Sequence, residues 1–189
     1  MDPKLLKIIL FIKLISPKTI LKNHEMIKDV IGQNVDWSDY QACGVSSQAL
    51  FNILLKKHNI PITHASYLKN DKINIESMLN SNCIMLVRLD GFPSHAFVIY
   101  NIHNKSIILQ SYIGCYDHRK HIDILSRNEM RYYLETLKNM YTDDNKITGE
   151  MIAVLNILTH VKHIIIPEGI NNLEKSFTIF YVPLLESRL

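Results

Sequence analysis

The chain is best understood from Asp39-Tyr-Gln-Ala-Cys-Gly-Val-Ser-Ser-Gln-Ala-Leu50. This segment predicts a short loop that ends in Cys43 and runs directly into a helix. The expected apolar face of that helix carries Val45, Ala49, Leu50, Ile53 and Leu54. The rest of the chain must supply the surface against which this face packs. It must also explain whether Cys43 has a structural or a chemical role.

Cys43 is the first candidate for chemistry. A cysteine in the first turn of a helix lies at the positive end of the peptide dipoles, so we expect a lowered thiol pKa and a nucleophilic thiolate. Gly44 has no Cβ and leaves room for a substrate backbone to approach the sulfur. The alternative is that Cys43 is a small buried hydrophobe, the commonest role of an intracellular cysteine.

Length and composition narrow the class of protein. The 189 residues, 47% of them hydrophobic, predict one domain over 1–189 with a substantial core. The net charge of +3 is spread along the chain and gives no support for a nucleic-acid partner. Three cysteines without CxxC or metal-ligand spacing indicate a reducing, cytoplasmic compartment and no metal.

The N-terminal segment 1–31 is expected to be helical. Its apolar run from Leu5 to Ile15 is broken by Lys7 and Lys13 and is too short to span a bilayer. The charges inside the run also disfavour a signal peptide. We expect an amphipathic helix that packs on the domain or on a partner protein, in preference to a membrane surface.

A loop is predicted from Gly32 to Asp39, after a helical or irregular piece at 19–31. The single tryptophan, Trp37, is expected to pin this loop to the core. An amide side chain near the loop is a natural donor to a developing oxyanion. The candidates are Gln33, Asn34 and Gln41.

The middle of the chain changes from helical to strand periodicity. After a short helix at 71–80, buried strands are predicted at 83–87, 95–100 and 106–112, with a turn at 90–93. The last two strands are expected to form an antiparallel hairpin that closes near His103 and Asn104.

The C-terminal segment 118–189 adds further helices and strands. Helices are predicted from the capping box at 126–129 to about Met140 and at 148–161, and strands at 164–166 and 176–182. This order predicts an α+β fold in which the Cys43 helix packs against an antiparallel sheet, with additional C-terminal helices.

His95 begins one strand of the predicted hairpin, and Gln110 ends the other. If the hairpin closes near His103, the two side chains lie at the same end of adjacent strands. Gln110 then accepts a hydrogen bond from the imidazole, and the other ring nitrogen serves Cys43 as base and then acid. Asp117 and Asp123 are alternative orienting groups. The other histidines show no HExxH pattern for zinc.

The motifs in segment 39–117 resemble the papain-like fold. They are Cys43-Gly44 at a helix start, His95-Ala-Phe-Val-Ile-Tyr100, and Ile108-Leu-Gln-Ser-Tyr-Ile-Gly114. The segment looks closest to the papain-like toxin and effector group that includes the catalytic domain of Pasteurella multocida toxin. That group normally has aspartate where this chain has Gln110, whereas papain itself uses a neutral amide.

The resemblance implies a cysteine hydrolase, either a protease or a glutamine deamidase, without a cofactor. Its substrate would be a protein of another organism, as expected of a viral or bacterial effector in a host cytoplasm. Catalysis would fall to Cys43, His95 and Gln110, with the backbone of Cys43 and the side chain of Gln41 holding the oxyanion. The rival hypotheses are a papain-like binding module without turnover and a membrane-surface or host-partner adaptor that works through the first helix.

Overall fold

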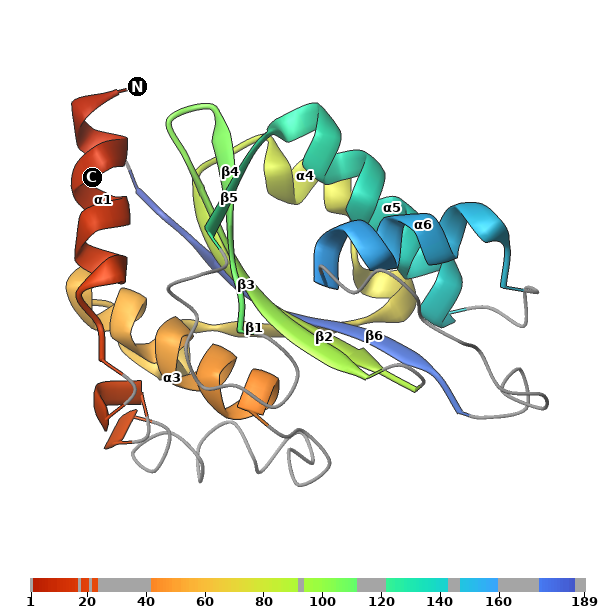
Figure 1. Cartoon of the computed structure of the whole chain (residues 1–189), viewed down its shortest axis with the longest axis horizontal. Helices are drawn as coiled ribbons and strands as arrows, with labels where there is room; N and C mark the ends of the chain where they lie inside the picture. Colours follow the sequence, from red (N-terminus) through yellow and green to blue (C-terminus); the bar gives the residue numbers. More distant parts are fainter. Residues whose placement is uncertain are drawn as a thin grey trace.

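The architecture is one antiparallel sheet with helices on both faces (Figure 1). The computed structural model describes residues 2–16, 18–20, 22–23, 42–91, 94–111, 122–142, 147–159 and 174–185. Within these ranges the sheet has six strands in the order β1-β6-β2-β3-β4-β5, and every neighbouring pair is antiparallel. The predicted α+β fold with an antiparallel sheet is confirmed.

The described elements comprise strands, α-helices and 3₁₀ turns. The strands are β1 (Ser66–Lys69), β2 (Cys83–Asp90), β3 (His95–Ile102), β4 (Lys105–Leu109), β5 (Ile122–Ser126) and β6 (Ser176–Pro183). The α-helices are α1 (Pro3–Lys13), α3 (Ala42–Lys57), α4 (Ile75–Leu79), α5 (Arg127–Thr142) and α6 (Gly149–Thr159). Two 3₁₀ turns, η1 (Ile62–His64) and η2 (Asn70–Lys72), flank β1.

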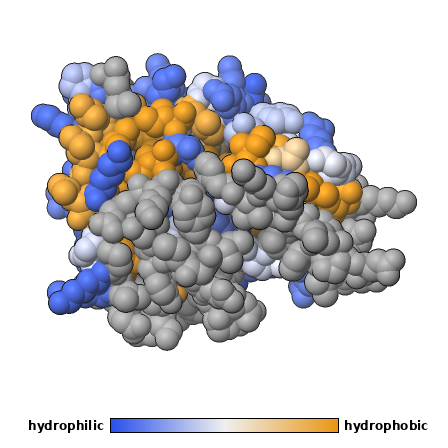
Figure 2. Space-filling view, in the orientation of Figure 1, coloured by the Kyte–Doolittle hydropathy of each residue, from blue (hydrophilic) through white to orange (hydrophobic). Residues whose placement is uncertain are grey.

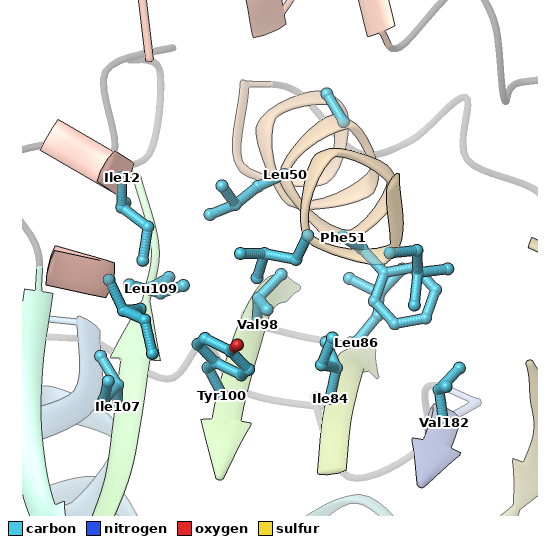
Figure 3. Packing of buried hydrophobic residues seen from close by; sticks show 14 of the residues in the cluster. Ile12, Leu50, Phe51, Ile84, Leu86, Val98, Tyr100, Ile107, Leu109 and Val182 are labelled. Atoms are coloured by element: carbon cyan, nitrogen blue, oxygen red, sulfur yellow. The ribbon is translucent and has the colours of Figure 1, made fainter. Parts of the chain in front are cut away.

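Side chains of β3 point alternately to the two faces of the sheet, and each face is covered by its own layer of the core. Ala96, Val98 and Tyr100 join the cluster formed with α1 and α3, and Phe97 and Ile99 join the cluster formed with α4, α5 and α6. Figure 3 shows the first layer, where Leu50 and Phe51 of α3 lie over the strands that carry Val98 and Leu86. Because both faces are covered, all eight residues of β3 are buried.

The predicted hairpin is present as β3 and β4. Ile102 pairs with Lys105 and Val98 with Leu109, so the strands are joined by the two-residue turn His103-Asn104. Both turn residues have positive φ, 51° and 62°, as a type I′ turn requires. Asparagine tolerates this conformation better than most residues, which suits its position in the turn.

The helix of Cys43 differs in detail from the expectation. It begins at Ala42, so Cys43 lies inside its first turn. Ala49, Leu50 and Leu54 are buried as expected, but Val45 and Ile53 are only half-buried. Phe51 and Leu55 take their places in the core. The sheet therefore meets a face of α3 that is rotated from the one the apolar pattern indicates.

Other differences concern short elements. The strand β1 is not predicted, because a four-residue edge strand that is mostly exposed has no apolar signal. The helix expected at 71–80 is divided into η2 and α4, and the Asn74 side chain caps α4 by accepting from the Ser77 N–H at 3.1 Å. The capping box at Ser126 and Glu129 is confirmed by two reciprocal hydrogen bonds of 3.1 and 3.2 Å.

Several predicted features lie outside the described residues. They are the loop at 32–39 with Trp37, most of the piece at 19–31, and the strand at 164–166. In the part of the chain that is described, no helix has the length and apolar character to cross a membrane.

Candidate active site

His95 and Gln110 meet at one end of the β3–β4 hairpin. His95 is the first residue of β3, Gln110 follows the last residue of β4, and each is only 2% exposed. The His95 Nε2 atom lies 2.7 Å from the Gln110 Oε1 atom. The β3–β4 hairpin thus brings together His95 and Gln110, the two side chains that were predicted to meet at this end. The His95 ring also stacks on Phe97, with the ring centroids 5.8 Å apart.

The orientation of the Gln110 amide determines the tautomer of His95. The Gln110 Nε2 atom donates to the backbone carbonyl of Leu158, near the C-terminal end of α6. Since only the amide nitrogen can donate, the amide oxygen faces His95 and must accept from it. His95 therefore carries its proton on Nε2 when neutral, and Nδ1 carries the lone pair that a general base needs.

Cys43 approaches the same end of β3 from the opposite side of the sheet. The backbone of Ala96, the residue after His95, forms a hydrogen bond with the Cys43 sulfur. The Ser47 hydroxyl donates to the Ala96 carbonyl at 3.0 Å, so the first two turns of α3 are docked on the start of β3. The structure therefore brings His95 to Gln110 but does not bring its ring to Cys43. Cys43 lies beside the Ala96 main chain on the α3 face of the sheet, while the His95 ring extends toward Gln110 and Phe97 on the α6 face.

The expected lowering of the Cys43 pKa is wrong for this arrangement. Burial raises the pKa of the Cys43 thiol, and its side chain is 5% exposed. Hydrogen bonds from the backbone of Ala96, Gly44 and Cys43 itself lower the pKa, but by less than burial raises it. The helix start does supply N–H donors to the sulfur, as expected, yet desolvation outweighs them. The thiol form is therefore favoured at neutral pH.

The expected oxyanion donors are described in part. Gly44 is buried in the first turn of α3, and its backbone is one of the groups at the Cys43 sulfur. Gln41, Gln33 and Asn34 lie outside the described residues, as does the alternative orienting group Asp117. The other alternative, Asp123, pairs with Ile108 in the sheet, whereas Gln110 forms the hydrogen bond to His95.

A polar hollow adjoins the site. It has a volume of about 340 Å³ and is lined by Asp90, Gly91, Ser94, Glu174, Lys175 and Ser176. Ser94 directly precedes His95 in the chain. The Asp90 carboxylate accepts from Arg88 Nε at 2.9 Å and from the Ser176 hydroxyl at 3.0 Å, which fixes the wall of the hollow. His95 itself does not line the hollow and is 2% exposed, so the hollow is connected to the site only through Ser94.

Of the other described histidines, His64 is exposed at the end of η1, and two have structural partners. His58 is buried and hydrogen-bonded to the hydroxyl of Tyr100. His103 lies in the hairpin turn, with its Nδ1 atom 3.9 Å from a carboxylate oxygen of Asp2. Within the described residues, no group of three His, Cys, Asp or Glu side chains is arranged to hold a metal ion.

Three residues that position the site were not singled out in the sequence as site residues. Ala96 bonds to the Cys43 sulfur, Ser47 ties α3 to β3, and Leu158 orients Gln110. The small side chain that follows His95 was an available signal, since a close helix–strand approach favours alanine. Ser47 bonds to backbone, as serines in helices commonly do, but its partner lies 49 residues away in the sequence. Leu158 acts through its carbonyl and leaves no signal in the sequence.

Comparisons with protein-family models, with curated proteins and with solved structures find no match. The candidate chemistry of this chain therefore depends on its own residues Cys43, His95 and Gln110.

Proposed function

We propose that this protein is a papain-like cysteine hydrolase that cleaves a peptide, isopeptide or glutamine side-chain amide of a protein substrate. The observation that supports this most strongly is the 2.7 Å hydrogen bond from His95 Nε2 to Gln110 Oε1. It orients an imidazole at the same end of β3 to which a helix-start cysteine is docked. Nucleophile, base and orienting group are then Cys43, His95 and Gln110.

In the proposed mechanism the resting pair is neutral. Because burial raises the Cys43 pKa, the thiol keeps its proton until a substrate is bound. Because Cys43 and the His95 ring lie on opposite faces of the sheet, the proposal requires the ring to turn toward the sulfur when substrate binds. Its Nδ1 atom then accepts the thiol proton as the sulfur attacks the carbonyl carbon, and a tetrahedral oxyanion forms. The backbone N–H groups of Cys43 and Gly44 serve as donors to this oxyanion.

Collapse of the intermediate breaks the carbon–nitrogen bond. The imidazolium of His95 gives its proton to the departing nitrogen, and an acyl thioester remains on Cys43. Water, deprotonated by His95, then attacks the thioester and releases a carboxylic acid together with the free thiol. A peptide or isopeptide yields an amine in the first step, and a glutamine side chain yields ammonia.

The neutral Gln110 suits this mechanism because of its neighbour on α6. The Leu158 carbonyl requires a donor, which an amide supplies and an ionised carboxylate does not. An aspartate or glutamate at this position would place negative charge against a carbonyl oxygen. Gln110 therefore orients His95 without adding charge, and it stabilises the imidazolium less than a carboxylate would.

Acylation by an activated ester tests the proposal without knowledge of the substrate. p-Nitrophenyl acetate is added at neutral pH, and peptide mass spectrometry locates the acetyl group. We expect a hydroxylamine-sensitive acetyl thioester on Cys43 in the wild type, which forms much more slowly in His95→Ala. Acetylation that is absent from Cys43, or equally fast in both proteins, would refute the hydrolase.

A second candidate, a papain-like binding module without turnover, is favoured by the raised Cys43 pKa and the 5% exposure of its side chain. It predicts that Cys43 is not acetylated by the ester and that Cys43→Ala leaves partner binding intact. If the hydrolase is supported, new amino termini in a host cytoplasmic protein indicate a protease. Ammonia release without cleavage indicates a deamidase.

A further inference from the structure

Helix α1 has a second apolar face that the core does not use. Leu5, Ile8, Ile9 and Ile12 are buried against the sheet side of the molecule. On the other side Leu6, Leu10 and Leu14 are 44%, 50% and 84% exposed. Their spacing of four residues aligns them in one stripe along the helix. Figure 2 shows apolar side chains gathered over the side of the molecule where α1 lies.

Positive charge borders this leucine stripe on both sides. At 100° per residue, Lys13 lies on one flank, and Lys7 and Lys4 on the other. All three lysines are exposed, and within the described residues none pairs with a carboxylate. Residues 3–23 contain five lysines and neither aspartate nor glutamate. Lys57, whose Nζ atom lies 4.2 Å from the centroid of the Phe11 ring, adds a further cation.

We propose that the leucine stripe of α1 docks on an anionic lipid surface. A helix that lies in the interfacial plane needs apolar side chains for the acyl boundary and lysines for the headgroups, and α1 presents both on one face. A second copy of the chain is a poor occupant, because it would bring the flanking lysines of both copies together. With 11 residues, α1 is about 16 Å long and lies on the membrane without spanning it.

The surface proposed to dock, on α1, is separate from the candidate active site. The contact of Lys57 with Phe11 places the C-terminal end of α3 beside α1 (Figure 1). Cys43 lies at the other end of α3, about 21 Å away along the helix axis at 1.5 Å per residue. The Cys43 end of α3 therefore lies well away from the contact between α3 and α1.

Vesicle co-sedimentation tests this proposal. The full chain is mixed with vesicles of phosphatidylcholine alone or with about one third phosphatidylserine, a content that gives an anionic surface. We expect binding to the anionic vesicles only. The triple variant Leu6→Ser/Leu10→Ser/Leu14→Ser should lower the partition coefficient at least about tenfold, and Lys4→Gln/Lys7→Gln/Lys13→Gln should do the same.

A matched control removes exposed apolar side chains elsewhere. Ile124→Ser/Ile157→Ser changes residues that are 36% and 54% exposed on β5 and α6, and it should bind like the wild type. Circular dichroism confirms that each variant is folded. Absence of binding to anionic vesicles, or an equal loss in the control, overturns the proposal. The proposal is also overturned if the wild type is a dimer and the leucine variant is a monomer, because a second copy then covers the stripe. Cys43→Ala should bind vesicles normally, which separates this test from that of the hydrolase.

Discussion

Cys43 and Cys83 are both buried, and they differ in the groups that surround the sulfur. Cys83 begins β2, is 0% exposed, and burial raises its pKa to about 12 although Asn101 and Arg127 lower it in part. Cys43 lies in the first turn of α3, where backbone groups of Ala96, Gly44 and Cys43 offset part of the rise. At Cys43 the main-chain groups, with Ala96 of β3 contributing most, lower the thiol pKa by less than burial raises it, so the pKa is still raised.

Alkylation rates should differ most between these two cysteines. With a pKa of about 12, Cys83 holds a thiolate fraction on the order of 10⁻⁴ at pH 8, in a fully buried position. We expect iodoacetamide to label Cys43 at least about 100-fold faster than Cys83. Peptide mass spectrometry over time measures both rates in one sample. Equal rates would show that the surroundings of Cys43 confer no reactivity.

The orienting amide should not tolerate a carboxylate. Gln110→Glu places an acceptor against the Leu158 carbonyl, and we expect a loss of about 3 kcal/mol in the free energy of unfolding at pH 8. The loss should shrink at acid pH, because a protonated glutamate can donate to that carbonyl. Urea denaturation at several pH values measures the effect. A variant as stable as the wild type at pH 8 would contradict the assigned amide orientation.

Alkaline pH should destabilise the fold through Cys83. The unfolded thiol loses its proton near its ordinary pKa of about 8.5, whereas the folded thiol keeps it to about 12. The stability from this group is therefore complete below pH 8.5 and is lost as the pH rises toward 12, with about 2 kcal/mol lost by pH 10. Urea denaturation of Cys83→Ala should show a shallower alkaline slope. An unchanged slope would exclude this thiol as the cause.

The smallest expected difference in unfolding free energy is between substitutions of Ser47 and of Ser46. Ser47→Ala removes the hydrogen bond to the Ala96 carbonyl and should cost about 1 kcal/mol of unfolding free energy. The Ser46 hydroxyl is buried and has no hydrogen-bond partner among the described residues, so Ser46→Ala should be neutral or slightly stabilising. Chemical denaturation compares the two variants. Equal losses would show that the Ser47 bond does not anchor α3.

Local patterns predicted much of the fold and one contact of the candidate site. The β3–β4 hairpin follows from two apolar runs and a turn with asparagine, and it brings His95 to Gln110 across a separation of 15 residues. The capping box of α5 is likewise a local signal. The strand β1 was not predicted, because its four residues are mostly exposed and, within the described residues, pair only with the distant strand β6.

The features of the site that were not predicted from the sequence depend on contacts between distant segments. The carbonyl of Leu158 reaches Gln110 across 48 residues and involves no side chain of its own. The docking of Ser47 on Ala96 spans 49 residues. The predicted lowering of the Cys43 pKa was wrong. The start of α3 can be predicted from the sequence, whereas the burial of Cys43, which raises the pKa, depends on the whole fold.

The most direct test of the proposed pairing is the pH dependence of Cys43 alkylation in the wild type and in His95→Ala. If His95 accepts the proton of Cys43, the wild-type rate should rise through the range where histidine ordinarily titrates. The variant should then rise only at alkaline pH, where the thiol with its raised pKa ionises. Superimposable profiles would contradict the pairing of Cys43 with His95.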